Sequence, residues 1–162
     1  MKRGMRLLSP SDGNILECSL ATRKEGMHRN GAQNKDFSDQ DADGWVRLLP
    51  VGCCLFAPAD GLLLEGGCRE LRLRCRGQTE ILLSLEGGRS SHGLLDPLVD
   101  RGAPVSAGQV LAHLRRAGED LAPLSLRISL KTPHTVRLFT EETHLVGGKT
   151  PLLLLEARGR AR

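Results

Sequence analysis

The side chains of this sequence that could do chemistry are few and scattered. Ser84 lies among leucines in the stretch TEILLSLEGG, and Cys68 and Arg69 are adjacent to each other further upstream. A serine is a weak nucleophile unless a base lies beside it. Arg69 cannot be that base, because a guanidinium group keeps its proton near neutral pH. A guanidinium beside a hydroxyl and glycines can instead bind an anion, such as a phosphorylated metabolite or a carboxylate of a partner protein.

Two other side chains could act as nucleophiles. A neighbouring positive charge such as Arg69 favours the reactive thiolate form of Cys68, although a packed thiol at a strand end is the plainer interpretation. His92, in the segment GGRSSHG, could fold over Ser84 or be an exposed loop histidine. The remaining histidines show no spacing that predicts a pair; they are His28, His113, His134 and His144.

The cysteines predict neither a metal site nor a cofactor. There are five, Cys18, Cys53, Cys54, Cys68 and Cys75, and no two have the CxxC spacing of a zinc site. Small buried hydrophobes are the simplest role for most of them. The first residues lack the apolar core of a signal peptide, and no apolar run approaches about 18 residues. We therefore expect a cytoplasmic protein with reduced thiols and no segment inserted into a membrane.

The composition is that of a soluble globular domain, with 40% hydrophobic and 26% charged residues. A chain of 162 residues favours a single domain over residues 1–162. Only 2% of the residues are aromatic and the net charge is +4, with scattered arginines, so nucleic-acid binding is not expected. The polar, aperiodic segment 21–43 predicts a flexible loop insertion, and residues 157–162 predict a basic tail.

Short apolar runs between glycines and prolines predict an all-β fold, an antiparallel β-sandwich or flattened barrel with a few short helical turns. In ELRLRC, residues 70–75, Leu71 and Leu73 should face the core while Arg72 and Arg74 face outward. The run ILLSL does not alternate and should be buried on both faces. Helical turns are expected at 94–99 and 115–122. The expected strands are 5–8, 14–18, 45–49, 53–57, 62–65, 70–75, 80–85, 109–114, 124–130, 134–139 and 151–156.

Two similar turns suggest a barrel built of related halves. SPSDG at 9–13 and APADG at 57–61 each place a proline before an Asp-Gly pair, which favours the positive φ of tight turns.

Five motifs follow one another over some 150 residues, and each alone is a weak signal. They are LLSPSDGNILE (7–17), DGWVRLLPVGCCLFAPADGLLLE (43–65), RELRLRCRGQTEILLSLEGG (69–88), DRGAPVSAGQVLAHL (100–114) and VGGKTPLLLLE (146–156). In this order they resemble the glucose-type IIA phosphocarrier domain of the bacterial phosphoenolpyruvate–sugar phosphotransferase system. In that family, the phosphocarrier protein HPr phosphorylates a histidine, a second histidine lies beside it, and the IIB domain of a membrane transporter takes the phosphoryl group.

The resemblance assigns the acceptor position to Ser84 and the supporting position, 15 residues earlier, to Arg69, so both histidines are replaced. It assigns three further binding positions to Gly67, Glu86 and Gly88. We expect Ser84 and Arg69 to be neighbours on adjacent strands in a shallow depression. A phosphoserine ester is too stable to be passed on reversibly, so this site should not relay phosphoryl groups.

Three interpretations follow. The first is a IIA-like component of a sugar phosphotransferase system that binds or regulates without relaying phosphate; its partners would be an HPr-like phosphocarrier, IIB or IIC transporter components, or a regulated cytoplasmic protein. The second is a working phosphocarrier with Cys68 or His92 as acceptor. The third, a biotinyl or lipoyl carrier module, rests on the turn in GAPVSAGQVLAHL, but no lysine has the context of a modification site and such modules have about half this length.

Overall fold

The computed structural model describes residues 4–20, 42–87, 95–115, 124–141 and 144–157. Nearly all of the predicted insertion and tail, Gly88, His92 and the expected helical turn after Arg115 lie outside these ranges. The described residues form the strands β1 (Met5–Leu8), β2 (Asp12–Ser19), β3 (Gly44–Val51), β4 (Cys54–Phe56), β5 (Gly61–Gly66), β6 (Glu70–Cys75), β7 (Thr79–Gly87), β8 (Leu95–Pro97), β9 (Pro104–Val105), β10 (Val110–Leu114), β11 (Leu124–Lys131), β12 (Thr135–Leu138), β13 (His144–Leu145) and β14 (Pro151–Glu156).

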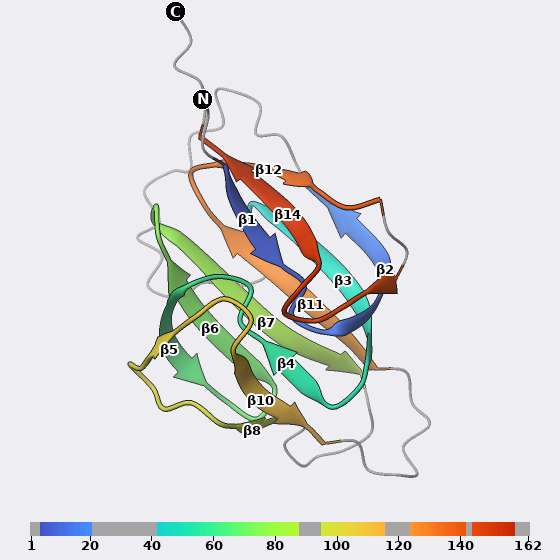
Figure 1. Ribbon diagram of the computed structural model, residues 1–162, viewed down its shortest axis with the longest axis vertical. Coiled ribbons are helices and arrows are strands. Elements are labelled where there is room, and N and C mark those ends of the chain that lie inside the picture. The colour runs from blue at the N-terminus through green and yellow to red at the C-terminus, as the bar shows by residue number, and fades with distance from the viewer. Residues whose placement is uncertain (1–3, 21–41, 88–94, 116–123, 142–143, 158–162) are drawn as a thin grey trace, which may run out of the picture.

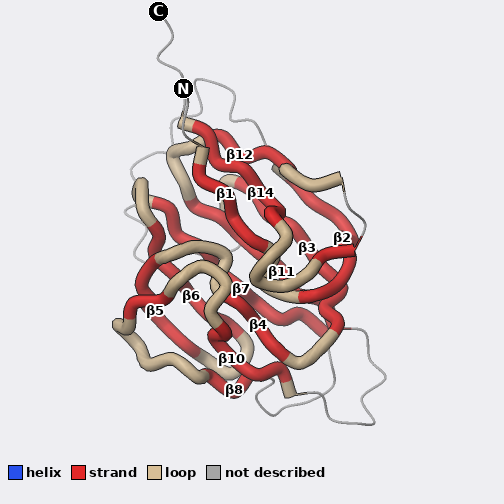
Figure 2. The backbone as a smooth tube through the Cα atoms, viewed as in Figure 1, coloured by secondary structure: helices blue, strands red, loops and turns tan. Residues whose placement is uncertain are grey.

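The strands form an antiparallel β-sandwich. The large sheet has eight strands in the order β13-β2-β3-β11-β7-β6-β5-β9, and two three-stranded sheets have the orders β1-β14-β12 and β4-β10-β8. The small sheets lie over one face of the large sheet, β1 and β14 over β3 and β11, and β4 and β10 over β7 (Figure 1). Figure 2 shows that the described residues lie in strands and loops. The predicted fold class is thus confirmed.

All eleven expected strands are present, and three strands of two or three residues, β8, β9 and β13, were not expected. The helical turn expected at 94–99 is wrong, because Leu95–Pro97 pairs with β10. Pro97 is tolerated there since β8 is the edge of its sheet, where a missing N–H costs no ladder bond. Within the described ranges, no helix is long and apolar enough to cross a membrane.

The core lies between the small sheets and the large one. Leu71 and Leu73 of β6 are fully buried, and Arg72 and Arg74 point away from the core, as the alternation predicts. In β7, every residue of the run ILLSL is buried, because β7 lies in the middle of the large sheet with β6 and β11 on either side. Its odd-numbered residues face the core, so Ser84 belongs to the opposite face.

The two similar turns are related by exchanged hydrogen bonds. Leu8 N donates to Pro58 O, and Phe56 N donates to Pro10 O, both at 2.8 Å. The side chains repeat this symmetry. Asp12 Oδ1 accepts from Gly147 N at 2.6 Å, and Asp60 Oδ1 accepts from Ala107 N at 2.7 Å. The two turns are therefore equivalent in their contacts, and each aspartate binds the backbone of a glycine-containing loop, at Gly147 before β14 and at Ala107 before β10.

Candidate functional site

Ser84 lies at the centre of the outer face of the large sheet, the face turned away from the core. Glu70 of β6 lies opposite it on one side and Arg127 of β11 on the other. Two residues back along β7, Leu82 has the cross-strand partners Arg72 and Ser129. Side-chain alternation along three paired strands therefore brings these groups onto one surface.

The residue opposite Ser84 is set by the turn between β6 and β7. This turn has three residues, 76–78, and Gly77 and Gln78 adopt positive φ angles of 70° and 59°. Cys75 therefore pairs with Thr79. The pairing continues without a bulge along both strands, so that Glu70 pairs with Ser84. The partner of Ser84 is accordingly 14 positions earlier (84 − 70), and not 15.

The expected pairing of Ser84 with Arg69 is wrong by one position in register. Arg69 lies opposite Leu85, whose N–H donates to Arg69 O at 2.9 Å. The Arg69 guanidinium instead donates to the carbonyl of Gly87 at 3.2 Å. Consecutive residues of a strand point to opposite faces, so the residue directly opposite Ser84 on the outer face is Glu70 and not Arg69.

The surface around Ser84 contains buried polar atoms without partners. Ser84 is 5% exposed, and its Oγ makes no hydrogen bond with any residue that the structure describes. The Nε atoms of Arg72 and Arg127 are likewise buried and unpaired. Such atoms are rare in native proteins because each costs free energy when it leaves water without a partner.

Next to these atoms lies a network of charges. Glu86 accepts from Arg47 at 3.0 and 3.2 Å and contacts Arg127 at 3.5 Å. Arg47 also pairs with Glu17 at 3.1 Å. The guanidinium groups of Arg127 and Arg47 lie 4.6 and 5.3 Å from the centroid of the Trp45 ring. Glu86, expected as a binding residue, therefore balances two arginines.

Sequence reasoning missed Arg47, Arg72 and Arg127 as site residues. The alternation in RELRLRC already turned Arg72 outward, but nothing in the sequence alone says that β3 and β11 join β7 on the same sheet. The signal that could have found them is the same period of two, applied to WVRLL and LSLRISL: each places one arginine among outward-facing positions.

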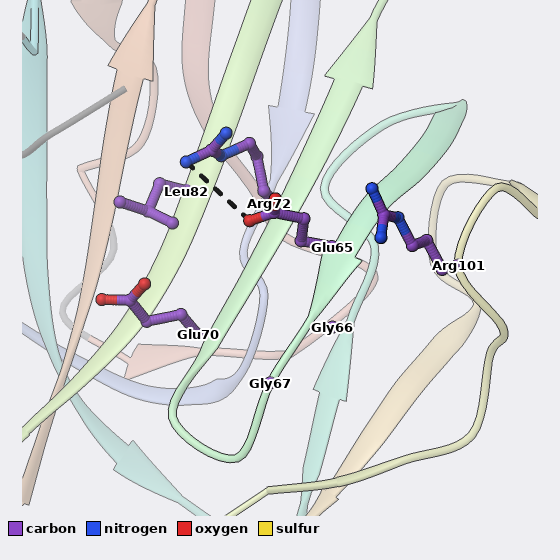
Figure 3. A pocket seen from close by; sticks show the side chains of 7 residues that line it. All are labelled: Glu65, Gly66, Gly67, Glu70, Arg72, Leu82 and Arg101. Atoms are coloured by element: carbon purple, nitrogen blue, oxygen red, sulfur yellow. Dashed lines mark ion pairs between the residues drawn. The ribbon is translucent and has the colours of Figure 1, made fainter. Parts of the chain in front are cut away.

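A pocket of about 300 Å³ adjoins this surface at the turn between β5 and β6 (Figure 3). Its lining residues are Glu65, Gly66, Gly67, Glu70, Arg72, Leu82 and Arg101. In Figure 3, Arg72 reaches over Leu82 toward Glu65, with which it makes an ion pair at 4.0 Å, while Arg101 comes from a separate loop on the other side. Gly67, predicted as a binding residue, lines this pocket.

Of the two alternative acceptors, the structure describes only Cys68. Cys68 is exposed in the turn before β6, and its carbonyl accepts from Leu95 N at 2.8 Å. It is not among the residues lining the pocket. His92 lies outside the described residues, as does Gly88.

Two further cysteines, Cys53 and Cys54, lie close to a histidine. Cys54 Sγ lies 3.9 Å from Cys53 Sγ and 3.8 Å from His113 Nδ1. Burial, and then the neighbouring Cys53 thiol, raise the pKa of Cys54, so this thiol stays protonated. No three His, Cys, Asp or Glu side chains in the described part of the chain are arranged to hold a metal ion.

Comparison with known proteins identifies the fold. No protein-family model matches the sequence, and no curated protein sequence matches it either. Among solved structures, the chain is similar to the glucose permease IIA from Mycoplasma capricolum, with a TM-score of 0.63 and 17% sequence identity. The match covers 94% of this chain and 96% of that one. The chain therefore has the fold of a glucose-type IIA domain, as the order of its motifs predicts.

Proposed function

We propose that the protein is a IIA-like component of a sugar phosphotransferase system that binds a ligand or partner and does not relay phosphoryl groups. The fold over nearly the whole chain and the five motifs in family order support the pathway. One observation supports the proposal that the protein does not relay phosphoryl groups. The acceptor position is Ser84, flanked by Glu70 and Arg127, with no imidazole beside it among the described residues.

The chemistry explains why this exchange matters. A relay needs a nucleophile that is neutral near pH 7 and forms a labile bond to phosphorus, and imidazole does both. Ser84 could attack only with a base beside it, and its Oγ makes no hydrogen bond to Glu70 or to any other described group. A phosphoserine formed there would be a stable ester, so the chain of transfer would stop.

The proposed partners are the cytoplasmic components that such a domain meets: an HPr-like phosphocarrier, the IIB or IIC parts of a sugar transporter, or a cytoplasmic protein under its control. A cytoplasmic location follows from these partners. In this proposal, the outer face around Ser84 is the contact surface. Arg47, Arg127 and Glu86 make this surface charged, but they do not supply a nucleophile for phosphoryl transfer.

A phosphoryl-transfer assay tests the proposal. The protein is incubated with phosphoenolpyruvate, enzyme I and HPr, and intact mass is measured under mildly alkaline conditions that preserve phosphohistidine. A working IIA domain is the positive control. We expect no phospho-adduct on the folded protein. A stoichiometric adduct on Cys68 or His92 would refute the proposal and favour the working phosphocarrier, whereas a stable ester on Ser84 would not.

The variants Cys68→Ser and His92→Gln then identify the acceptor in that case. An adduct lost in Cys68→Ser alone assigns the thiol, and one lost in His92→Gln alone assigns the imidazole. An adduct that survives both and disappears in Ser84→Ala assigns the hydroxyl, and its resistance to mild acid would mark a stable ester. The biotinyl or lipoyl alternative is disfavoured because the fold match spans nearly all of both chains.

A further inference from the structure

We propose that the outer face around Ser84 binds the phosphate group of a small phosphorylated sugar, held by Arg72, Ser84 and Arg127. This inference rests on the proposed function, since it assigns a ligand class to the site that has lost its relay. It replaces Arg69, the anion-binding residue expected from the sequence, with two arginines that face the same side of the sheet as Ser84.

The unpaired atoms carry the inference. Among the described residues, four buried side-chain polar atoms lack a hydrogen-bond partner, and three of them are Ser84 Oγ, Arg72 Nε and Arg127 Nε. The two arginine atoms can only donate, and the hydroxyl can donate as well. A group of buried donors without acceptors is explained by a ligand that supplies several acceptor oxygens, and an oxyanion does so.

The register places the three donors within reach of one group. Arg127 lies directly opposite Ser84, and Arg72 is a diagonal neighbour because it pairs with Leu82. Directly opposite residues have Cβ atoms about 5 Å apart and diagonal ones about 7 to 8 Å, distances that long side chains span easily. A tetrahedral phosphate between the two guanidinium groups could accept from both and from the hydroxyl.

The present ion pairs leave these arginines available. The contact between Arg72 and Glu65 is at the limit of an ion pair, 4.0 Å, and the Glu65 side chain is 61% exposed. Arg127 meets Glu86 at 3.5 Å, whereas Glu86 is closer to Arg47, at 3.0 Å. A phosphate would therefore compete with one long ion pair at each arginine, that of Glu65 with Arg72 and that of Glu86 with Arg127.

The adjoining pocket indicates what the phosphate is attached to. Arg72 belongs both to the donor group and to the pocket lining, so the pocket borders the donor group. The volume of about 300 Å³ lies at the lower end of small-molecule sites. Leu82 offers an apolar surface for a ring, and the carboxylates of Glu65 and Glu70 can accept hydrogen bonds from hydroxyls.

The test is a titration followed by two-dimensional NMR and calorimetry. The probes are glucose 6-phosphate, inorganic phosphate and glucose. We expect saturable binding of glucose 6-phosphate, binding of inorganic phosphate at least about fivefold weaker, and no binding of glucose. Shifts should centre on β6, β7 and β11. Equal affinities for the two phosphate probes would overturn the sugar part of the proposal, and no saturable binding would overturn all of it.

Variants give the assignment to residues. Arg72→Gln and Ser84→Ala should each weaken glucose 6-phosphate binding, Arg72→Gln by about tenfold or more, because each removes a donor. Arg74→Gln is the matched control: Arg74 is two positions away on the same strand and face, and it pairs with Glu80. Ser84→Ala removes only one oxygen atom, so this variant should fold even if Arg72→Gln does not. Unchanged binding in both donor variants, or an equal loss in Arg74→Gln, would contradict the proposal.

The two proposals fail in different ways. A phospho-adduct on Cys68 or His92 in the transfer assay refutes the loss of relay whatever the titration shows. Absence of binding with no adduct refutes only the phosphosugar site. Saturable binding that Arg72→Gln weakens, together with no adduct, supports both.

Discussion

Ser84 of β7 and Glu70 of β6 are direct cross-strand partners on the outer face of the large sheet. Because Leu85 N bonds to Arg69 O, the neighbouring pair is the hydrogen-bonded one, and Ser84 and Glu70 form one of the close, non-hydrogen-bonded pairs. Their Cα atoms should then be about 4.5 Å apart, closer than the Cα atoms of the hydrogen-bonded pairs.

This register predicts which cysteine pair can form a disulfide. In a Cys68→Ser background, Glu70→Cys with Ser84→Cys should oxidise readily, because the separation suits a disulfide. The bond closes a loop of about 15 residues and should stabilise the fold by about 3 kcal/mol. Peptide mapping and urea unfolding with and without reductant measure both effects. Arg69→Cys with Ser84→Cys is the control; a bond there, and none between 70 and 84, would show that the register is wrong.

The burial of β7 predicts that alanine substitutions at two leucines, Leu83 of β7 and Leu62 of β5, change the free energy of unfolding by very different amounts. Leu83 is fully buried between the sheets, so Leu83→Ala should cost about 2 to 5 kcal/mol through lost burial and a cavity. Leu62 on β5 is 44% exposed, and Leu62→Ala should change the free energy of unfolding by less than about 1 kcal/mol. Urea denaturation of both variants decides; similar costs would mean that the two leucines are not packed as described.

The strands were predictable because their patterns are local. ELRLRC alternates, and ILLSL does not, and both statements survive in the structure as a half-exposed β6 and a buried β7. The two-residue strands β9 and β13 escaped prediction because they are too short for a period to appear. The sequence predicts a helical turn at 94–99, whereas Leu95–Pro97 pairs with β10, a long-range contact that no local signal reports.

The sequence suggested a candidate site but not the groups that surround it. The family resemblance selected Ser84, and the structure places this residue on the outer face between Glu70 and Arg127. It also assigned the supporting position to Arg69, 15 residues earlier, whereas the residue directly opposite Ser84 is Glu70, because the length of one turn sets the register. A three-residue turn brings Glu70 opposite Ser84, and the partners from β11 are separated from β7 by more than 30 residues of sequence (127 − 84 = 43).

The symmetric turns predict a matched loss of stability. Asp12→Ala and Asp60→Ala each remove a carboxylate that accepts from a backbone N–H, at 2.6 and 2.7 Å. Each should cost about 1.5 to 3 kcal/mol, since hydrogen bonds to charged groups are the stronger ones. Asp100→Ala, at an exposed position, is the control and should be nearly neutral. Thermal and urea unfolding measure the change in the free energy of unfolding. A large loss for only one of the two aspartates would show that the two turns do not contribute equally to stability.

Cys75 predicts a loss of stability at alkaline pH. Burial, with a smaller contribution from the Asp60 charge, raises the pKa of Cys75 from 9.0 to about 11. The folded state therefore holds this proton at a pH where the unfolded chain has released it. The resulting stability is complete below about pH 9 and is lost as the pH rises through about 11, by at most about 1.4 kcal/mol per pH unit.

The comparison of the protein with Cys75→Ala isolates this effect. Urea unfolding over the same pH range should show a shallower decline for the variant, because the other titrating groups are shared. Parallel curves for the two proteins would mean that the thiol has the same proton affinity in both states. Iodoacetamide should also modify the exposed Cys18, Cys53 and Cys68 well before Cys75.

Glu86 connects the charge network to the proposed phosphate site. It contacts Arg127, one of the three donors, and Arg47, so Glu86→Gln leaves both guanidinium groups with less negative charge nearby. We expect the free energy of unfolding to fall by about 1 kcal/mol, since these groups are only partly buried. We also expect glucose 6-phosphate to bind several-fold more tightly, because the carboxylate no longer competes for Arg127.

The matched control for Glu86→Gln lies on the same strand and the same face. Glu80 of β7 pairs with Arg74 at 3.5 Å, away from the three donors, so Glu80→Gln removes an equal charge without freeing Arg127. Calorimetry should show tighter binding in Glu86→Gln and nearly unchanged binding in Glu80→Gln. An equal gain in both would reduce the effect to overall charge, and a weaker affinity in Glu86→Gln would mean that the carboxylate orients Arg127 for the ligand instead of competing with it.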